Sequence, residues 1–148
     1  MALGASVFRT DLDGAQAAIH SYGCGFDMTR RDRQQDGKDN RRPWDLGKDF
    51  EGSAVLGALT PVARVLSLSG RRIHLAVNGA PRQDALLDEM VWSPAEVIRH
   101  LSRFYHLQPG DLIMTGTPAG VGPVVAGDVI TGGIDGLEAI SLTLGPAE

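Results

Sequence analysis

The chain has 148 residues, a formal net charge of −4 and a hydrophobic fraction of 43%, which together fit one globular domain with a core. The negative charge argues against general nucleic-acid binding, which normally requires a basic excess. The sequence contains neither a run of about 18 apolar residues typical of a membrane span nor the pattern of a secretion signal. Its single cysteine cannot form an internal disulfide bond, so we expect a cytoplasmic protein.

Glycine content and the first half of the sequence favour a β-rich fold. The 19 glycines, against a usual share of about 7%, suit tight turns better than a helix bundle. Thr10 or Asp11 can cap a short helix at about 11–20. The stretch "YGCGFDM" predicts a buried strand that carries Asp27 at its far end. Segment 32–52 is polar and predicts a helical turn and a long loop, which at this length is usually functional or disordered.

The second half contains the clearest local signals. "RRIHLAVNGAPRQ" alternates apolar and polar residues, and Asn78-Gly79 can supply the two positive φ angles of a type I′ hairpin turn. "SPAEVIRHLSRFYHL", residues 93–107, predicts a helix with a capping box, proline at its first position and an apolar stripe that ends with Phe104 and Tyr105.

The rest of the chain predicts further strands. "DLIMTGT", residues 111–117, is expected to be a strand, and residues 127–144 predict two strands joined at Asp135-Gly136. We therefore expect one domain over residues 1–148. Its fold class is β-rich α+β, a mixed β-roll or sandwich with short helices.

Two charged side chains are candidates for chemistry, and each has an ordinary alternative. Asp27 could pair with the nearby Arg30 or Arg31, or it could bind a hard metal ion, since Mg²⁺ and Mn²⁺ prefer carboxylate oxygens. Lys48 lies in a loop between Trp44 and Phe50. It could be an exposed lysine, as lysines usually are, or its amine could stabilise a developing oxyanion or enolate.

The glycine-rich segment "GDLIMTGTPAGVGP" is the third candidate. It lacks the Gly-Lys-Ser/Thr ending of a phosphate loop, so that motif does not indicate nucleotide binding. It is either a wide turn between strands or a backbone-rich cradle in which the hydroxyl group of Thr115 or Thr117 donates to a carboxylate.

The order and spacing of three segments resemble the fumarylacetoacetate hydrolase family. These are "GFDMTRRDRQ", "RPWDLGKDFEGSA" and "PGDLIMTGTPAGVGPVVAGD", and the resemblance runs from about Ala2 to Leu144. The closest branch resembles the acylpyruvate hydrolases, including fumarylpyruvate and maleylpyruvate hydrolases. The resemblance implies the C-terminal domain type of that family, a homodimer, a small diketo-acid substrate, and a role in aromatic-compound catabolism.

The resemblance also implies roles for single residues. Asp27 matches one ligand of a Mg²⁺ or Mn²⁺ ion. Arg31 and Gln34 match residues that line the substrate site, and Lys48 matches the active-site lysine. Thr117, with Gly116 before it, matches the threonine that holds the substrate carboxylate.

The family reaction is cleavage of a C–C bond in β-diketo acids. The resemblance implies that the metal polarises the oxo acid and that Lys48 stabilises the departing enolate. Related members decarboxylate oxaloacetate or isomerise diketo acids, so the reaction type stays open.

The opening residues "MALGASV" match a family stretch that follows an E-x-E segment with the other two metal ligands. No E-x-E occurs in the 148 residues, so we expect an amino-terminally truncated, partial domain. The family's His-Glu pair, which activates water, also belongs to the upstream part. We expect the chain by itself to bind metal weakly or not at all and to be inactive or weakly active. The alternative is a non-catalytic remnant.

Overall fold

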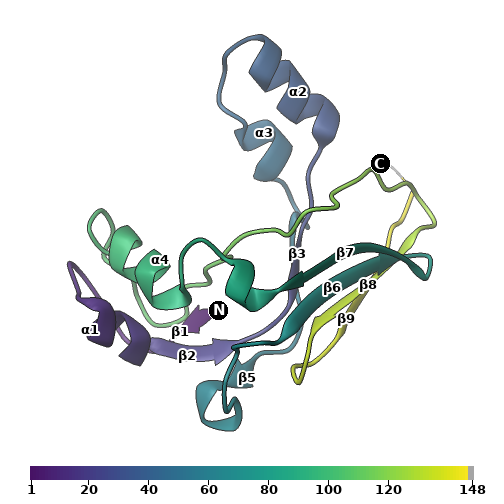
Figure 1. Ribbon diagram of the computed structural model, residues 1–148. Coiled ribbons are helices and arrows are strands. Elements are labelled where there is room, and N and C mark those ends of the chain that lie inside the picture. Colours follow the sequence, from purple (N-terminus) through teal and green to yellow (C-terminus); the bar gives the residue numbers. More distant parts are fainter. Residues whose placement is uncertain (147–148) are drawn as a thin grey trace. The chain divides into compact units, whose positions relative to one another are not determined.

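The computed structural model describes residues 1–146 and divides the chain into two compact units (Figure 1). Unit 1 consists of Met1–Cys24 and the chain from Gly57 onward, and unit 2 is Gly25–Leu56. The expected fold class is confirmed: the chain is α+β, rich in sheet, with few and short helices.

Unit 1 contains two sheets and two α-helices. Its elements are β1 (Ala2–Leu3), α1 (Leu12–Ala17), β2 (Ile19–Tyr22), β5 (Thr60–Pro61), β6 (Arg72–Val77), β7 (Ala80–Leu86), α4 (Pro94–Leu101), β8 (Val129–Ile134) and β9 (Ile140–Thr143). Two 3₁₀ turns, Val62–Arg64 and Leu87–Glu89, complete it. The elements of unit 2 are β3 (Gly25–Asp27), α2 (Arg31–Asp39), α3 (Asp45–Lys48) and β4 (Ala54–Leu56).

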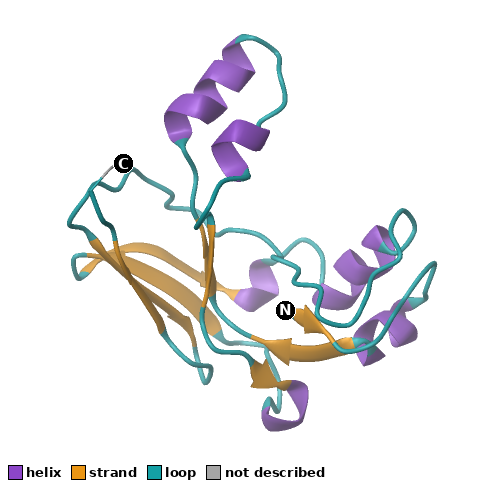
Figure 2. Cartoon of the chain, turned by 180° about the vertical axis from the view of Figure 1, so that it is seen from behind, coloured by secondary structure: helices purple, strands orange, loops and turns teal. Residues whose placement is uncertain are grey.

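The larger sheet of unit 1 is a four-stranded antiparallel sheet in the order β7-β6-β8-β9, as labelled in Figure 1. Figure 2 shows its strands in orange. The predicted hairpin is confirmed, because Asn78 and Gly79 have φ angles of 52° and 78° between β6 and β7. The Asn78 side chain also joins this turn to the start of β8. Its amide nitrogen donates to Asp128 Oδ1 at 2.7 Å, and its oxygen accepts from the Val129 backbone N–H at 2.9 Å.

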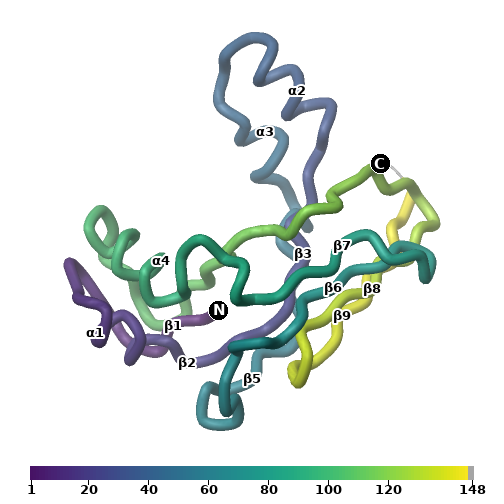
Figure 3. Tube along the Cα trace, in the orientation of Figure 1, coloured from purple at the N-terminus to yellow at the C-terminus, as the bar shows by residue number. Residues whose placement is uncertain are grey.

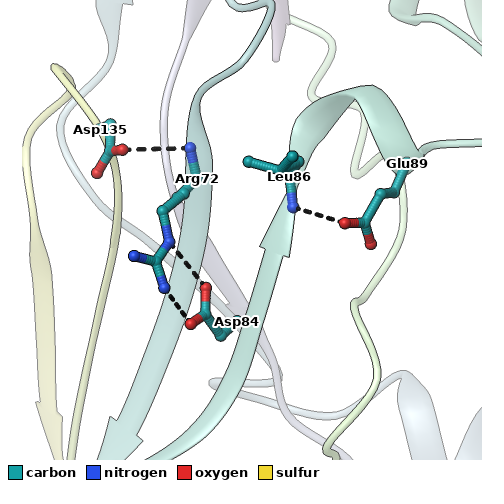
Figure 4. Close-up of polar contacts among 5 residues, drawn as sticks. All are labelled: Arg72, Asp84, Leu86, Glu89 and Asp135. Carbon is teal, nitrogen blue, oxygen red and sulfur yellow. Dashed lines mark hydrogen bonds and ion pairs between the residues drawn. The ribbon is translucent and has the colours of Figure 1, made fainter.

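Arg72 connects three parts of the same sheet (Figure 4). Its guanidinium group forms a two-contact ion pair with Asp84 on β7. Its backbone N–H donates to Asp135 in the turn between β8 and β9 at 3.3 Å. The hydrogen bond and charge of Asp84 hold the pKa of Arg72 above its ordinary value. At the end of β7, the Leu86 N–H donates to Glu89 Oε1 at 3.3 Å, so the strand passes directly into the 3₁₀ turn.

The smaller sheet, β1-β2-β5, and helices α1 and α4 contribute to a hydrophobic core cluster of unit 1. The core residues are Leu3, Ala15, Ala18, Ile19, Ala95, Ile98, Leu107 and Ile113. Helices α1 and α4 pack against each other, and Ile98 of α4 is fully buried. The start of the chain lies along residues 110–113, where the Leu3 N–H donates to the Asp111 carbonyl at 3.0 Å (Figure 3).

Both predicted helices of unit 1 exist but are shorter than expected. The first ends at Ala17 because the next residues form β2, which pairs with β1 and β5. The second begins at Pro94 with the expected Ser93–Glu96 capping box and ends at Leu101. Phe104 and Tyr105 are 67% and 61% exposed, so their assignment to the buried stripe was wrong.

Two further expectations were wrong. Within the described chain, residues 111–117 form no strand, and only Leu112 makes an isolated bridge, to Ala2. Segment 32–52, expected to be mostly loop, contains helices α2 and α3. The two strands expected around Asp135-Gly136 are β8 and β9, as predicted. Among residues 1–146, no helix combines the length and apolar character needed to cross a membrane.

We expect Ile98→Ala to lower the free energy of unfolding of unit 1 by about 2–5 kcal/mol, because it opens a cavity in a fully packed site. Leu66→Ala is the matched control, since Leu66 is 100% exposed. Urea unfolding followed by circular dichroism measures both changes. Equal losses in the two variants would contradict the position of Ile98 in the core.

Asp128 should make stability depend on pH. Hydrogen bonds from the Val125 N–H and from Asn78 hold the pKa of Asp128 below its ordinary value in the folded chain. A lowered pKa stabilises the fold above the unfolded-state pKa of about 4, and this contribution is lost as the pH falls through the folded-state value.

Asp128→Asn should therefore lower the urea midpoint most near pH 7, and the difference from the parent chain should shrink below about pH 4. Glu138→Gln, at an exposed position of the β8–β9 turn, is the control. A difference between Asp128→Asn and the parent that stays constant from pH 7 to pH 3 would count against this role.

Candidate active site

Unit 2 is a helical hairpin carried on a two-stranded ladder. Strands β3 and β4 are antiparallel, with Phe26 opposite Val55 and Asp27 opposite Ala54. The Met28 N–H donates to the Ser53 carbonyl at 2.8 Å, which extends the pairing beyond Asp27. Asp27 therefore lies at the end of a strand, as the sequence predicted, and the chain then enters α2.

Helices α2 and α3 approach each other closely at Gly47. A Cβ atom at this position would lie 2.9 Å from the Gln34 backbone nitrogen and 3.1 Å from its Cα atom. The Gly47 carbonyl also accepts a hydrogen bond from the Arg30 N–H at 3.0 Å. Glycine at 47 thus allows α3 to lie against the first turn of α2, and Gln34 is left 8% exposed.

This packing brings Lys48 to Asp27. The Lys48 ammonium group forms an ion pair with Asp27 Oδ1 and also donates to Thr29 Oγ1 at 3.0 Å. The Lys48 and Asp27 side chains are 35% and 36% exposed, so both remain open to solvent or a ligand. The ordinary alternative for Asp27, a pair with Arg30 or Arg31, was wrong, because its ion-pair partner is Lys48.

Arg31 fixes the orientation of the Gln34 side chain. Arg31 Nη1 donates to Gln34 Oε1 at 3.0 Å. Because a guanidinium group has only donors, the atom of Gln34 that it meets must be the amide oxygen. The amide NH₂ group of Gln34 is then the part that can donate to an oxygen of another molecule.

The two aromatic residues near Lys48 contact other cations. The Arg30 guanidinium lies 4.3 Å from the centre of the Phe50 ring, and the Lys38 amine lies 4.9 Å from the centre of the Trp44 ring. These contacts stabilise the hairpin from its two sides, and the amine of Lys48 stays directed to Asp27 and Thr29.

Gly116 and Thr117 belong to unit 1, in an irregular segment. Gly116 has a φ of 133°, which favours glycine, and Thr117 is exposed. The following residues are attached to strand β7, since Gln83 Nε2 donates to the Pro118 carbonyl at 2.8 Å. At Gly120, with a φ of 98°, a Cβ atom would lie 1.9 Å from the Arg82 carbonyl oxygen.

Sequence reasoning missed two side chains in these regions. Thr29 accepts a hydrogen bond from Lys48, and its place two residues after the candidate Asp27 was the signal that could have found it. Gln83 is buried although it is polar. Apolar and polar residues alternate in this part of the sequence, so a glutamine on the inner face of strand β7 could have been predicted to need a hydrogen-bond partner.

The described residues by themselves do not fit a bound metal ion. Residues 1–146 contain no group of three His, Cys, Asp or Glu side chains that could hold one. Asp27 supplies one carboxylate, and Lys48 already neutralises it. Mg²⁺ and Mn²⁺ are usually held by more oxygen ligands than this one side chain supplies.

Comparison with models of known protein families shows to which family the chain belongs. The family described as fumarylacetoacetate (FAA) hydrolase C-terminal matches residues 1–144. The chain belongs to the fumarylacetoacetate hydrolase family. The expected resemblance is therefore confirmed over both compact units.

Relatives within the fumarylacetoacetate hydrolase family differ in activity. The chain is 49% identical to the fumarylpyruvate hydrolase of a Ralstonia species over all 148 residues, which span 77% of that relative. It is 39% identical to the mouse mitochondrial oxaloacetate tautomerase FAHD1 over 126 residues, 82% of this chain and 57% of the relative.

A solved structure of the same family has the same fold. The crystal structure of the Pseudomonas aeruginosa fumarylpyruvate hydrolase in complex with Mn²⁺ and pyruvate matches with a TM-score of 0.94 and 41% identity. The match covers 99% of this chain and 63% of that one. This chain thus spans less than two thirds of both the crystallised hydrolase and the mouse relative.

We expect Gly47→Ala to destabilise unit 2 by about 1–3 kcal/mol, because the added methyl group forces α3 away from the backbone of Gln34. Trp44 fluorescence in a Trp92→Phe background reports on unit 2 during urea unfolding. Gly145→Ala is the control, since a Cβ atom there meets no atom within 4 Å. An unchanged Trp44 transition in Gly47→Ala would contradict the close approach.

Proposed function

We propose that this chain belongs to a metal-dependent enzyme that hydrolyses a C–C bond in acylpyruvates, with fumarylpyruvate or a close analogue as substrate. The 49% identity to a fumarylpyruvate hydrolase over the whole chain carries the proposal. The contact between Lys48 and Asp27 supports it. It places the proposed catalytic ammonium group beside the carboxylate that is proposed to bind the metal ion.

The residues of unit 2 supply donors for an acceptor-rich substrate. A diketo acid presents carbonyl and carboxylate oxygens, all of which accept hydrogen bonds. Lys48 donates to the oxygen that becomes negative when the enolate of the product leaves. Gln34, oriented by Arg31, donates its amide NH₂ group to a second substrate oxygen.

Family membership supports the remaining parts of the proposal. Gly116 and Thr117 bind the substrate carboxylate, with the threonine hydroxyl group as donor. Asp27 is one ligand of a divalent cation, Mg²⁺ or Mn²⁺. The enzyme is a cytoplasmic homodimer that acts in aromatic-compound catabolism.

A tautomerase or decarboxylase of oxaloacetate is the second candidate. The 39% identity to an oxaloacetate tautomerase favours it, and oxaloacetate carries the same oxo and carboxylate groups. The two candidates differ in whether a C–C bond breaks by hydrolysis. Product analysis with fumarylpyruvate, acetylpyruvate and oxaloacetate as parallel substrates separates them.

We expect the 148-residue chain by itself to bind Mn²⁺ weakly and to turn over fumarylpyruvate at least about 10²–10⁴-fold more slowly than an extended chain. The extended chain carries at its amino end an added segment with the family's E-x-E and His-Glu residues, and the factor is the typical contribution of general-base catalysis. Loss of enol absorbance measures turnover, and electron paramagnetic resonance measures free Mn²⁺. Comparable turnover by both chains would show that the catalytic site is misplaced.

The same assay tests the site residues. In the extended chain, Lys48→Met should lower kcat by about 10²–10³-fold, the usual effect of removing one oxyanion donor. Lys38→Met is the matched control, since the Lys38 amine lies over the Trp44 ring. Equal activity of the two variants would remove Lys48 from the proposed mechanism.

A further inference from the structure

The environment of the Lys48 amine contains a residue to which the proposed function gives no role. Thr29 follows Asp27 by two residues, and the side chains of both accept a hydrogen bond from the Lys48 ammonium group. The Lys48–Thr29 contact is 3.0 Å long and partly buried. The backbone is held on either side of Thr29, because the Met28 N–H donates to the Ser53 carbonyl at 2.8 Å and the Arg30 N–H donates to the Gly47 carbonyl at 3.0 Å.

The number of donors on lysine gives this contact a consequence. An ammonium group has three N–H donors and no acceptor. Within residues 1–146, Lys48 donates to two side-chain oxygens, Asp27 Oδ1 and Thr29 Oγ1. Two engaged N–H bonds on a tetrahedral nitrogen fix the direction of the third, which is the donor that a substrate oxygen can meet.

The two partners of Lys48 differ in charge. Asp27 is an anion, and any cation that binds its carboxylate competes with Lys48 for it. Thr29 is a neutral hydroxyl group whose contact with Lys48 does not depend on that charge. The threonine can therefore hold the ammonium group while the carboxylate is engaged by another cation.

We propose that Thr29 is a positioning residue, whose hydroxyl group fixes the direction in which the Lys48 ammonium group donates to a substrate oxygen. This inference rests on the proposed role of Lys48 in the reaction. It assigns Thr29 no contact with the substrate. The threonine acts through the lysine alone.

Nuclear magnetic resonance of the lysine side chains tests the inference without any turnover. The chain contains only two lysines, Lys38 and Lys48, so protein labelled with ¹³C and ¹⁵N in lysine gives two sets of side-chain signals. A held Lys48 should show two separate Hε resonances and an observable ammonium signal. We expect Thr29→Val to merge the Hε resonances and broaden the ammonium signal, and Thr29→Ser to restore both.

The Lys38 signals should stay unchanged in every variant, and Thr131→Val, at an exposed position of β8, should leave Lys48 unchanged. Parent-like Lys48 signals in Thr29→Val would overturn the inference. If Thr29→Val changes the circular dichroism spectrum, Thr29→Ala takes its place as the test. Alanine also lacks the hydroxyl group but does not put a methyl group where it was. Unfolding of both variants would assign Thr29 to the fold and would also overturn the inference.

Kinetics of the extended chain separate this inference from the proposed function. Thr29→Val should lower kcat roughly 10–100-fold, the scale expected for a misplaced reacting group, with KM nearly unchanged and with recovery in Thr29→Ser. Absence of turnover in the extended parent chain would overturn the proposed function, while the lysine signals would still decide the role of Thr29. A change confined to KM would overturn the positioning role.

Discussion

The candidate site of unit 2 depends on the absence of a side chain at Gly47. Helix α3 contacts the backbone of Gln34 there, at a distance that a Cβ atom could not share. Because Lys48 is the next residue, this contact determines where its side chain begins. The Arg30 N–H, at the start of α2, donates to the Gly47 carbonyl and adds a hydrogen bond to this contact between the two helices. One close approach thus links a strand-end carboxylate, a lysine and a buried glutamine.

Unit 1 is organised by buried contacts of a different kind. Ser102 is fully buried just after α4. Its hydroxyl group donates to the Arg99 carbonyl at 2.9 Å and accepts from the Thr10 N–H at 3.3 Å. The end of α4 is thereby joined to the segment that leads into α1, beside the fully buried Ile98. The exposed Arg72–Asp84 pair adds little to stability by comparison, as solvent-exposed ion pairs usually do.

Local signals in the sequence predicted those features that short segments determine. The Asn78-Gly79 turn and the Ser93–Glu96 capping box depend on a few neighbouring residues, so they could be recognised without the fold. The family resemblance rested on spaced motifs and also held. The pairing of Asp27 with Lys48 over 21 positions could be suggested only through that resemblance, because it depends on how α2 and α3 pack.

The errors arose where tertiary contacts override local preference. Phe104 and Tyr105 continue the apolar period of α4, yet the helix ends at Leu101 and both rings are exposed. Residues 111–117 have the composition of a strand, but their backbone lies beside the first residues of the chain, where only Leu112 makes a bridge. Segment 32–52 is so polar that its sequence shows no apolar stripe of helical period. The residues of its ring–cation contacts do not recur at a helical spacing either, so the sequence pattern did not reveal its helices.

The junction between the units has a consequence for how this chain can vary. The Gly57 N–H donates to the Cys24 carbonyl at 3.0 Å, so the residues on either side of Gly25–Leu56 are already hydrogen-bonded neighbours. A segment whose two ends meet can change in length at small entropic cost, because the cost of closing a loop grows only with the logarithm of its length. Unit 2 is in this sense an exchangeable segment, which insertion, deletion or exchange can diversify while the sheets of unit 1 keep their sequence.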